Sequence, residues 1–438
     1  MSKIHVVEPI KPARGFIAPT YSLLARFIIR SFGSLYLRYV EGIKAIKFHN
    51  EDLLVEAFMQ LQKGQTPLIL AFRHTAKEDA PSLMWALQKE LSKSVRSLPK
   101  KERCETHAHF LYGSDVLEWA PKAASWLFPR LGAVGIQNRS SNKQAMDTIR
   151  SLLLESPFPI ALAPEGQVTY HMFESQGIAH GASSIAYYAL EQHKDVTIIP
   201  IAMGYLSQKG EKLRLQELLQ MWEKLTGEVI QHKGTKGLLE VTDVTFSLVE
   251  KHLHLFHPDK NLIDRRDAIC ETLLHRSEQL LHLSHEGTFL DRLFAIRYSA
   301  LDIQRPRSYH KKSLHSVEHA LMNVRALEAH TALYYSQIVD VLEYVDPSYI
   351  EQKESVIRQV EYMLNILDIL NRLQGGNIDS RYSFNDKTAH IYIGSPITLQ
   401  GAKTSPPKKR KQQIIEITDL LHNALQTSSS LLEPLLDN

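Results

Sequence analysis

Residues 68–81 read LILAFRHTAKEDAP, and the fold class follows from this stretch. Its first five residues are apolar and have the length of a buried β-strand. An α-helix tolerates proline mainly in its first turn, so Pro81 places the start of a helix near Asp79. His74 then lies in the turn that joins the strand to the helix. The stretch predicts one strand-turn-helix unit of an α/β sheet.

The histidine of this stretch has a chemical and a structural interpretation. Open α/β sheets bind their ligands at the carboxyl ends of the strands. A histidine there, oriented by Asp79, is suited to act as a general base for a hydroxyl nucleophile. Alternatively, Asp79 caps the helix, or Thr75 and Glu78 form a capping box. Capping explains the acidic residues but leaves His74 unexplained.

Outward from this stretch, residues 52–205 alternate short β-rich runs with helical segments. Strands that are apolar on both faces and separated by helices indicate a mixed, mostly parallel α/β sheet flanked by helices. The predicted strands are 66–72, 107–113, 133–137, 158–164 and 195–203, and the predicted helices are 53–62, 81–92, 143–154 and 182–192. The charged stretch 89–105 is interpreted as a loop excursion.

The sequence changes character after Gly204, where long amphipathic helices replace the alternation. A strand is predicted again within 389–399, and it needs a partner because unpaired backbone cannot be buried alone. We therefore predict that it returns to the first sheet. On this interpretation, 51–205 form the core of a discontinuous domain, 206–384 are a large helical insertion, and 385–438 supply the return strand, a basic linker and a C-terminal helix.

Residues 1–50 form a segment that is both basic and apolar. It holds eight Lys or Arg against two Glu, a balance of +6 in a chain whose total is +3. Large apolar residues such as Leu24 and Phe27 share the segment with arginines, and this mixture suits a helix in the headgroup layer of an anionic membrane. The arginines interrupt every apolar run, so no membrane span is predicted. The alternative is a helix packed on the domain with its arginines in water.

The composition favours one cellular compartment and argues against some classes of partner. Cys104 and Cys270 have no ligand-like spacing, which argues against a disulfide framework or a structural zinc site and favours the cytoplasm. Histidines at 252–257 and 282–285 lack a metal-like pattern of carboxylates or cysteines. The KKRK run at 408–411 is more typical of a solvated or membrane-facing linker than of a nucleic-acid contact. We expect no metal and no nucleic-acid partner.

Three more features follow the histidine in order along the chain. Arg139 ends a short strand beside serines that can cap the next helix, a place suited to a phosphate, although a solvated loop charge explains it as well. Glu165, between Pro164 and Gly166, can accept hydrogen bonds from a polyol, while glycine lets the backbone approach a ligand. Pro200 lies inside an apolar strand and predicts an edge or an irregularity.

These features together carry a family resemblance. The ordered set of H-x-x-x-x-D (His74 and Asp79), Arg139, P-E-G at 164–166 and Pro200 resembles the four blocks of the glycerolipid acyltransferase family. That family contains bacterial lysophosphatidate and glycerol-phosphate acyltransferases. HGASSIA at 180–186 and IYIGSPI at 391–397 are similar to later segments of the family. The resemblance covers 50–205 and 388–426, a little under half of the chain.

The resemblance implies an activity. His74 would deprotonate the hydroxyl of a lysophospholipid or glycerol phosphate, which attacks an acyl thioester on acyl-CoA or acyl carrier protein, and Asp79 would orient the imidazole. The residues implied to bind the acceptor are Arg139, Pro164, Glu165 and Gly166. The enzyme would act in phospholipid biosynthesis or remodelling, peripherally on the inner face of a membrane. No metal or redox cofactor enters this chemistry.

The chain departs from the family pattern near the second and third blocks. Asn138 stands where the family commonly has an acidic residue, and QVTYHMF after P-E-G lacks the usual basic residues. Fewer positive charges leave open a lipid alcohol without a phosphate as the acceptor. The same departures leave open a non-catalytic lipid-binding or scaffolding protein that keeps the acyltransferase fold.

Overall fold

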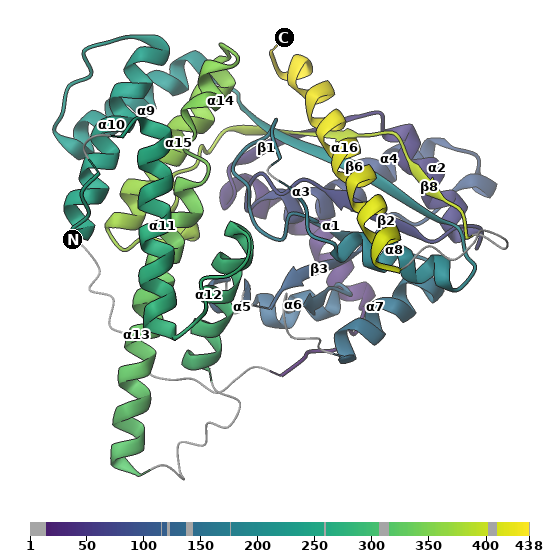
Figure 1. Ribbon diagram of the computed structural model, residues 1–438. Helices are drawn as coiled ribbons and strands as arrows, with labels where there is room; N and C mark the ends of the chain where they lie inside the picture. Colours follow the sequence, from purple (N-terminus) through teal and green to yellow (C-terminus); the bar gives the residue numbers. More distant parts are fainter. Residues whose placement is uncertain are drawn as a thin grey trace. The chain divides into compact units, whose positions relative to one another are not determined.

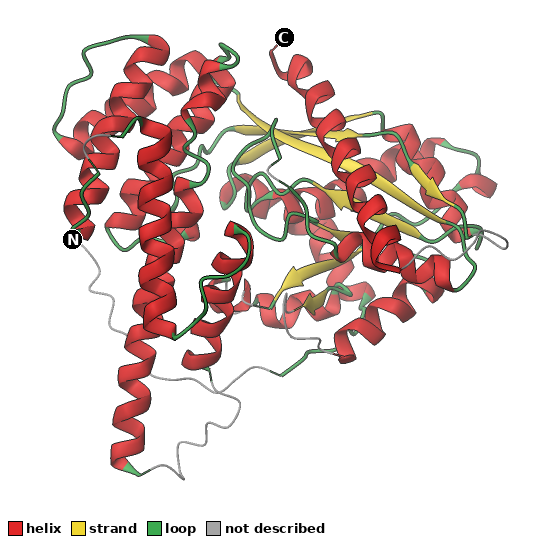
Figure 2. Ribbon diagram, viewed as in Figure 1, coloured by secondary structure: helices red, strands yellow, loops and turns green. Residues whose placement is uncertain are grey.

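The computed structural model describes residues 15–114, 116–120, 123–136, 143–175, 177–257, 260–305, 315–401 and 410–437. Contacts between residues divide the chain into two units. One is formed by Phe16–Gly210 together with Phe384–Asn438, and the other contains Glu211–Ser383. The first unit, here called the sheet unit, is built on a β-sheet, whereas the described part of the second, the helical unit, contains helices (Figures 1 and 2).

A mixed sheet forms the centre of the sheet unit (Figure 2). Its strands are β1 (Ile43–His49), β2 (Leu68–Phe72), β3 (His109–Gly113), β4 (Val134–Ile136), β5 (Ile160–Leu162), β6 (Val196–Ser207), β7 (Lys387–Ile393) and β8 (Ile397–Leu399). They lie in the order β1-β7-β6-β2-β5-β3-β4, and β8 also pairs with β6. Only the pairs β6/β7 and β6/β8 are antiparallel among these described strands. The predicted mixed, mostly parallel sheet is confirmed.

Helices cover both faces of this sheet, which explains why β2 is continuously apolar. Side chains alternate between the two faces along a strand. Leu68, Leu70 and Phe72 share one hydrophobic cluster with α2 and α3, while Ile69 and Ala71 share the other with α7, α8 and α16. These helices are α2 (Glu51–Gln62), α3 (Asp79–Ala86), α7 (Lys143–Glu155), α8 (Gly181–Glu191) and α16 (Arg410–Asp437).

Pro200 marks a change of neighbour along one side of β6. Residues 196–198 pair with β8, and residues 201–207 pair with β7. Proline has no N–H to donate at this break, and its carbonyl accepts from the backbone N–H of Gly394, between β7 and β8, at 2.9 Å. The predicted irregularity is present, but β6 is not an edge strand, because β2 pairs along its other side.

The sequence predicts no strand before residue 66, but β1 occupies Ile43–His49 at one end of the sheet and pairs in parallel with β7. Residues 43–49 were expected to belong to a separate membrane-associating segment. The strand reads IKAIKFH, and its two lysines contribute to a basic segment in which no strand was predicted. Lysines are common on edge strands, where they disfavour pairing with another chain.

The expectation of a loop at 89–105 is wrong for its first half. A π-helical turn (Leu87–Leu91) and α4 (Ser92–Ser97) follow α3 without a break. Leu87, Leu91 and Val95 are four residues apart and buried, so one helical face packs into the core. The charged residues that suggested a loop, such as Lys89 and Lys93, lie on the exposed face.

The first helix, α1 (Leu23–Tyr39), packs on the sheet unit through a narrow stripe. Its buried residues are Ala25, Gly33 and Leu37, and α1 contacts α3, β1 and α6 (Ala124–Arg130). A Cβ on Gly33 would lie 2.5 Å from the Trp85 ring, so glycine permits the close approach to α3. Most of the remaining large apolar side chains of α1 are exposed, among them Leu23, Leu24, Phe27, Phe32, Leu35 and Tyr39, while Ile28 and Ile29 are half-buried.

The helical unit packs its helices around α13 and α15. Its helices are α9 (Glu211–Thr226), α10 (Gly234–Leu253), α11 (Leu262–Leu281), α12 (Phe289–Gln304), α13 (Ser316–Leu342), α14 (Pro347–Glu351) and α15 (Val356–Leu373). α13 contacts α11, α12 and α15, and α15 also contacts α9 and α10. None of the described helices, in either unit, is long and apolar enough to cross a membrane.

Candidate active site

His74 and Asp79 meet where β2 ends and α3 begins. The ring nitrogen Nδ1 of His74 lies 3.1 Å from Oδ2 of Asp79. The Asp79 side chain is fully buried, whereas 23% of the His74 side chain is exposed. Because Nδ1 is held by the carboxylate, Nε2 is the ring nitrogen that is left to exchange a proton with a ligand.

Asp79 receives donors on both carboxylate oxygens. Oδ2 also accepts from the backbone N–H of Ala76 at 2.8 Å, and Oδ1 accepts from the hydroxyl of Tyr205 at 2.5 Å. Burial raises the pKa of Asp79 above its ordinary value, while His74, Ala76 and Tyr205 act in the opposite direction. A carboxylate that accepts from Nδ1–H leaves Nε2 unprotonated in the neutral ring, as a general base requires.

The start of α3 does not show the helix capping that the sequence offered as an alternative. Glu78 is the N-cap residue of α3, and it makes no side-chain capping bond. Its buried carboxylate instead forms an ion pair with Lys387 of β7. Thr75 donates from Oγ1 to the carbonyl of Met203 at 3.4 Å. The acidic residues of this stretch therefore contact β6 and β7 rather than form a capping box.

Glu165 lies beside His74, and each oxygen of its carboxylate has a partner within the protein. One oxygen, Oε1, forms a buried ion pair with Arg73, and Oε2 accepts from the backbone N–H of His74 at 2.6 Å. The exposed fraction of the Glu165 side chain is 1%. The expectation that Glu165 can accept hydrogen bonds from a polyol stays a prediction. In this structure the carboxylate fixes the backbone of His74.

The P-E-G segment makes a turn that encloses the backbone of His74. Gly166 has φ +75°, a conformation that glycine adopts readily, and its N–H lies 3.3 Å from the carbonyl of Ala163. Three residues on, Thr169 donates to the carbonyl of His74 from its backbone N–H at 2.7 Å and from its hydroxyl at 3.2 Å. The carbonyl of Pro164 accepts from Ala179 at 2.7 Å. His74 is thus held on both sides of its peptide backbone.

Arg73 links this turn to α16. This link was not predicted from the sequence. Its fully buried guanidinium donates to the hydroxyl of Ser429 in α16 at 2.8 Å, and to the carbonyls of His171 and Glu174 at 3.0 and 2.7 Å. Figure 1 shows α16 running along β6 and α8. An arginine beside the histidine was visible in the sequence, but its partners lie up to 356 residues away.

Arg139 lies outside the described residues. The strand before it, β4, belongs to the same parallel set as β3, β5 and β2. The carboxyl ends of these strands therefore face one edge of the sheet, where His74 and Glu165 also lie.

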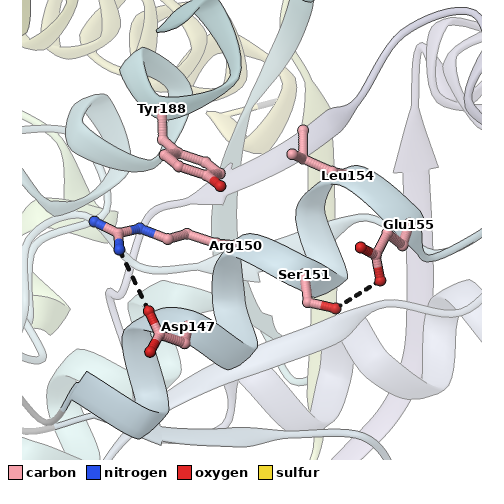
Figure 3. A pocket seen from close by; sticks show the side chains of 6 residues that line it. All are labelled: Asp147, Arg150, Ser151, Leu154, Glu155 and Tyr188. Atoms are coloured by element: carbon pink, nitrogen blue, oxygen red, sulfur yellow. Dashed lines mark hydrogen bonds and ion pairs between the residues drawn. The ribbon is translucent and has the colours of Figure 1, made fainter. Parts of the chain in front are cut away.

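A pocket on α7 and α8 lies outside this group of residues. Figure 3 shows the six side chains that line it, which are Asp147, Arg150, Ser151, Leu154, Glu155 and Tyr188. The guanidinium of Arg150 lies 4.9 Å from the ring centre of Tyr188. Ser151 donates to Glu155 at 2.8 Å. These polar groups are partnered within the pocket, and none of them is a predicted site residue.

In the helical unit, His275, Glu278 and His285 bring potential metal-ligand atoms within 4.8 Å of one another. This group includes a carboxylate that the sequence pattern did not reveal. Both oxygens of Glu278 accept from Arg292, at 2.6 and 2.9 Å, and Nδ1 of His285 lies 2.5 Å from one of them. The carboxylate is therefore neutralised by the guanidinium, and the cluster is accounted for as an ion-pair network.

The sheet unit therefore places a partly exposed histidine, paired with a buried carboxylate, at the end of one of its parallel strands, where open α/β sheets bind their ligands. The sequence model of the Acyltransferase family matches residues 45–204. The chain carries an acyltransferase domain of the glycerolipid acyltransferase type, and the protein is an acyltransferase. A comparison with curated proteins found no match.

Proposed function

We propose that the protein transfers a fatty acyl chain from acyl-CoA or acyl carrier protein to the hydroxyl of a lysophospholipid or glycerol phosphate, in phospholipid biosynthesis or remodelling. One observation carries the proposal. In an acyltransferase domain, the imidazole of His74 is partly exposed while its Nδ1 is held by the buried carboxylate of Asp79. This is the arrangement that general-base catalysis on a hydroxyl requires.

In the proposed reaction, Nε2 of His74 takes the proton of the acceptor hydroxyl as its oxygen bonds to the thioester carbonyl carbon. The carbon–sulfur bond then breaks, and the imidazolium returns the proton to the departing thiolate. General-base assistance of this kind is worth about 10² to 10⁴ in rate. Asp79 holds the imidazole in place and balances its positive charge. This step needs neither a metal nor a redox cofactor.

For the acceptor, we assign the edge of the sheet beside His74. Pro164 and Gly166 belong to the turn next to the histidine and would border the acceptor. Arg139 follows the end of β4 and would bind the acceptor phosphate. Because Glu165 is buried, its proposed contribution to the acceptor site is indirect, through the backbone of His74.

We also propose that the enzyme acts peripherally, on the inner face of a membrane. The support comes from α1, which exposes large apolar side chains in a segment with a charge balance of +6. Apolar side chains enter the region of the acyl chains, and basic side chains interact with anionic headgroups. An acceptor with one long chain partitions into the same layer.

The test is a panel of acyl-CoA and acyl carrier protein donors against lysophospholipids, glycerol phosphate and lipid alcohols without a phosphate. We expect product from at least one donor–acceptor pair, and we expect His74→Ala to reduce turnover about 10²-fold or more without unfolding the protein. His275→Ala, which changes an exposed histidine of the helical unit, is the matched control. Undiminished turnover in His74→Ala refutes the mechanism, and no product from any pair favours a lipid-binding or scaffolding protein.

A further inference from the structure

Tyr205 contacts the carboxylate that orients His74. It lies in β6, and its hydroxyl donates to Oδ1 of Asp79 at 2.5 Å. The other oxygen, Oδ2, receives Nδ1–H of His74 and the N–H of Ala76. The two oxygens thus have different partners, and Tyr205 is the described residue that donates to Oδ1.

Tyr205 is held rigidly where it meets Asp79. β6 pairs with β7 so that Tyr205 lies opposite Ala389, and its backbone N–H lies 3.1 Å from the sulfur of Met172. The ammonium of Lys387 lies 5.8 Å from the centre of the phenol ring. A side chain placed by a paired strand can fix a neighbouring group without the freedom of a loop residue.

The hydroxyl of Tyr205 remains a donor at neutral pH. Burial, followed by the negative charges of Asp79 and Glu78, raises the pKa of Tyr205 well above its ordinary value. The other charged or titratable groups at this place are Lys387, which pairs with Glu78, and the imidazole of His74. Tyr205 therefore presents a proton to the carboxylate at neutral pH.

We infer that Tyr205 is a positioning residue for acyl transfer, because its hydroxyl fixes the rotation of the Asp79 carboxylate that sets the tautomer and orientation of His74. The inference rests on the proposed function of His74. Without the hydroxyl, Oδ1 would be a buried acceptor that has lost its donor, which is unfavourable. The carboxylate would then rotate toward other donors, and its bond to Nδ1 would weaken.

Tyr205→Phe removes only the hydroxyl and tests the inference. We expect kcat/KM to fall by up to about 10²-fold, as for a small misplacement of a catalytic group. We also expect the acidic limb of the pH–rate profile to move to higher pH by about half a unit to one unit. The reason is that the hydroxyl dipole no longer offsets the negative charge of Asp79, so protonation of the base becomes easier.

A second readout does not depend on turnover. The ¹⁵N chemical shifts of the His74 ring report which nitrogen carries the proton, and His74→Ala assigns these signals among the 21 histidines. We expect a single Nδ1–H tautomer in the wild-type enzyme and a mixture in Tyr205→Phe. Tyr188→Phe is the matched control, because this tyrosine lies in the pocket on α7 and α8, and we expect it to behave as the wild type.

The outcomes separate this inference from the proposed function. If His74→Ala abolishes transfer but Tyr205→Phe keeps the wild-type pH limb and ring tautomer, the positioning inference is wrong and the proposed function stands. A lower rate in Tyr205→Phe with an unmoved limb and tautomer also overturns it, since that pattern indicates packing alone. If His74→Ala retains transfer, the proposed function fails, and the positioning inference fails with it.

Discussion

Arg73 and Glu165 form an ion pair in which both side chains are almost completely buried, at 0% and 1% exposure. Removing two charges from water is costly, and the cost is offset only when the remaining hydrogen-bonding groups are satisfied. Here Arg73 also donates to Ser429 and to two backbone carbonyls, while Glu165 accepts from the N–H of His74. The pair therefore connects the turn that carries His74 to α16.

Breaking this pair on one side should destabilise the sheet unit strongly. Arg73→Met leaves Glu165 buried and charged without its partner, and we expect a loss of about 3–5 kcal/mol in the free energy of unfolding. The double variant Arg73→Met/Glu165→Gln should recover part of this loss, because the amide oxygen can still accept from His74. Urea unfolding followed by tryptophan fluorescence measures both, since three of the four tryptophans lie in this unit.

The matched control is Arg26→Met, which removes an arginine from the pair with Glu105. Glu105 has a side chain that is 63% exposed, so this pair is screened by water. We expect a loss of no more than about 1 kcal/mol. Equal losses in Arg73→Met and Arg26→Met would contradict the importance of the buried pair, as would a double variant that is no more stable than Arg73→Met alone.

At the residue scale, the sequence could indicate that His74 and Asp79 form a pair, because they are close in the chain and precede Pro81. It could not indicate the partners of Arg73 or Tyr205. Tyr205 reaches Asp79 across 126 residues, and Arg73 reaches Ser429 across 356. Such contacts are set by the order of strands in the sheet, which local spacing does not contain. For the same reason, the sequence could not indicate that Glu165 forms a buried ion pair with Arg73.

At the scale of elements, α1 packs on the sheet unit, and its exposed apolar side leaves the proposed membrane contact to be tested. It packs on the sheet unit through Ala25, Gly33 and Leu37, as a core helix does. The side chain of Arg26 pairs with Glu105 and donates to Tyr21, so this arginine does not simply point to water. The other side of the helix is exposed and apolar, with Leu24 at 64% and Phe27 at 62% exposure. A face of this kind suits an interface.

The double substitution Leu24→Ser/Phe27→Ser tests whether this face binds lipid. Burying a large apolar side chain is worth about 1.5–3 kcal/mol, so losing two of them should weaken binding to vesicles by at least about tenfold. The measurement is sedimentation with vesicles of phosphatidylglycerol and phosphatidylcholine. Binding of the wild type should also fall as salt rises, because the basic residues contribute through charge.

The control for this experiment is Leu321→Ser/Val324→Ser in α13. These side chains are similarly exposed, at 61% and 55%, but they lie in the helical unit. We expect vesicle binding of this variant to match the wild type. If both double variants bind like the wild type, α1 does not mediate membrane binding, and if both lose binding, the effect is not specific to α1.

Strands and helices with a simple pattern were predicted well, and mixed patterns were not. β2 is apolar throughout because both of its faces are covered, and this continuous pattern survives without knowledge of the fold. β1 reads IKAIKFH at one end of the sheet, so its lysines concealed a strand. The helical turns from Leu87 to Ser97 were concealed by charged residues on their exposed face. In both elements that were not predicted, charged residues on the exposed side obscured the pattern of the buried apolar residues.

At the scale of the whole molecule, β6 and β7 show how one sheet accommodates a long excursion of the chain. The sequence suggested that a late strand returns to the first sheet, because an isolated strand needs a partner. β7 lies between β1 and β6, and its pairing with β6 places Lys387 opposite Ser207. The backbone N–H of Gln208 donates to the carbonyl of Asp386 at 2.9 Å. The chain therefore leaves and re-enters the sheet unit at adjacent positions.

Because these two positions are adjacent, the helical unit should be removable. We expect that replacing Glu211–Ser383 with about six Gly and Ser residues closes an antiparallel hairpin and leaves the sheet unit folded. Cooperative urea unfolding measures the fold, and the ¹⁵N shifts of His74 measure the site. His74, Asp79, Glu165 and Tyr205 all remain in the shortened chain, so we expect acyl transfer that His74→Ala abolishes in the same shortened background.

A shortened protein that unfolds without cooperativity would show instead that Glu211–Ser383 is an integral part of the fold. A folded but inactive one would assign the helical unit a direct part in transfer.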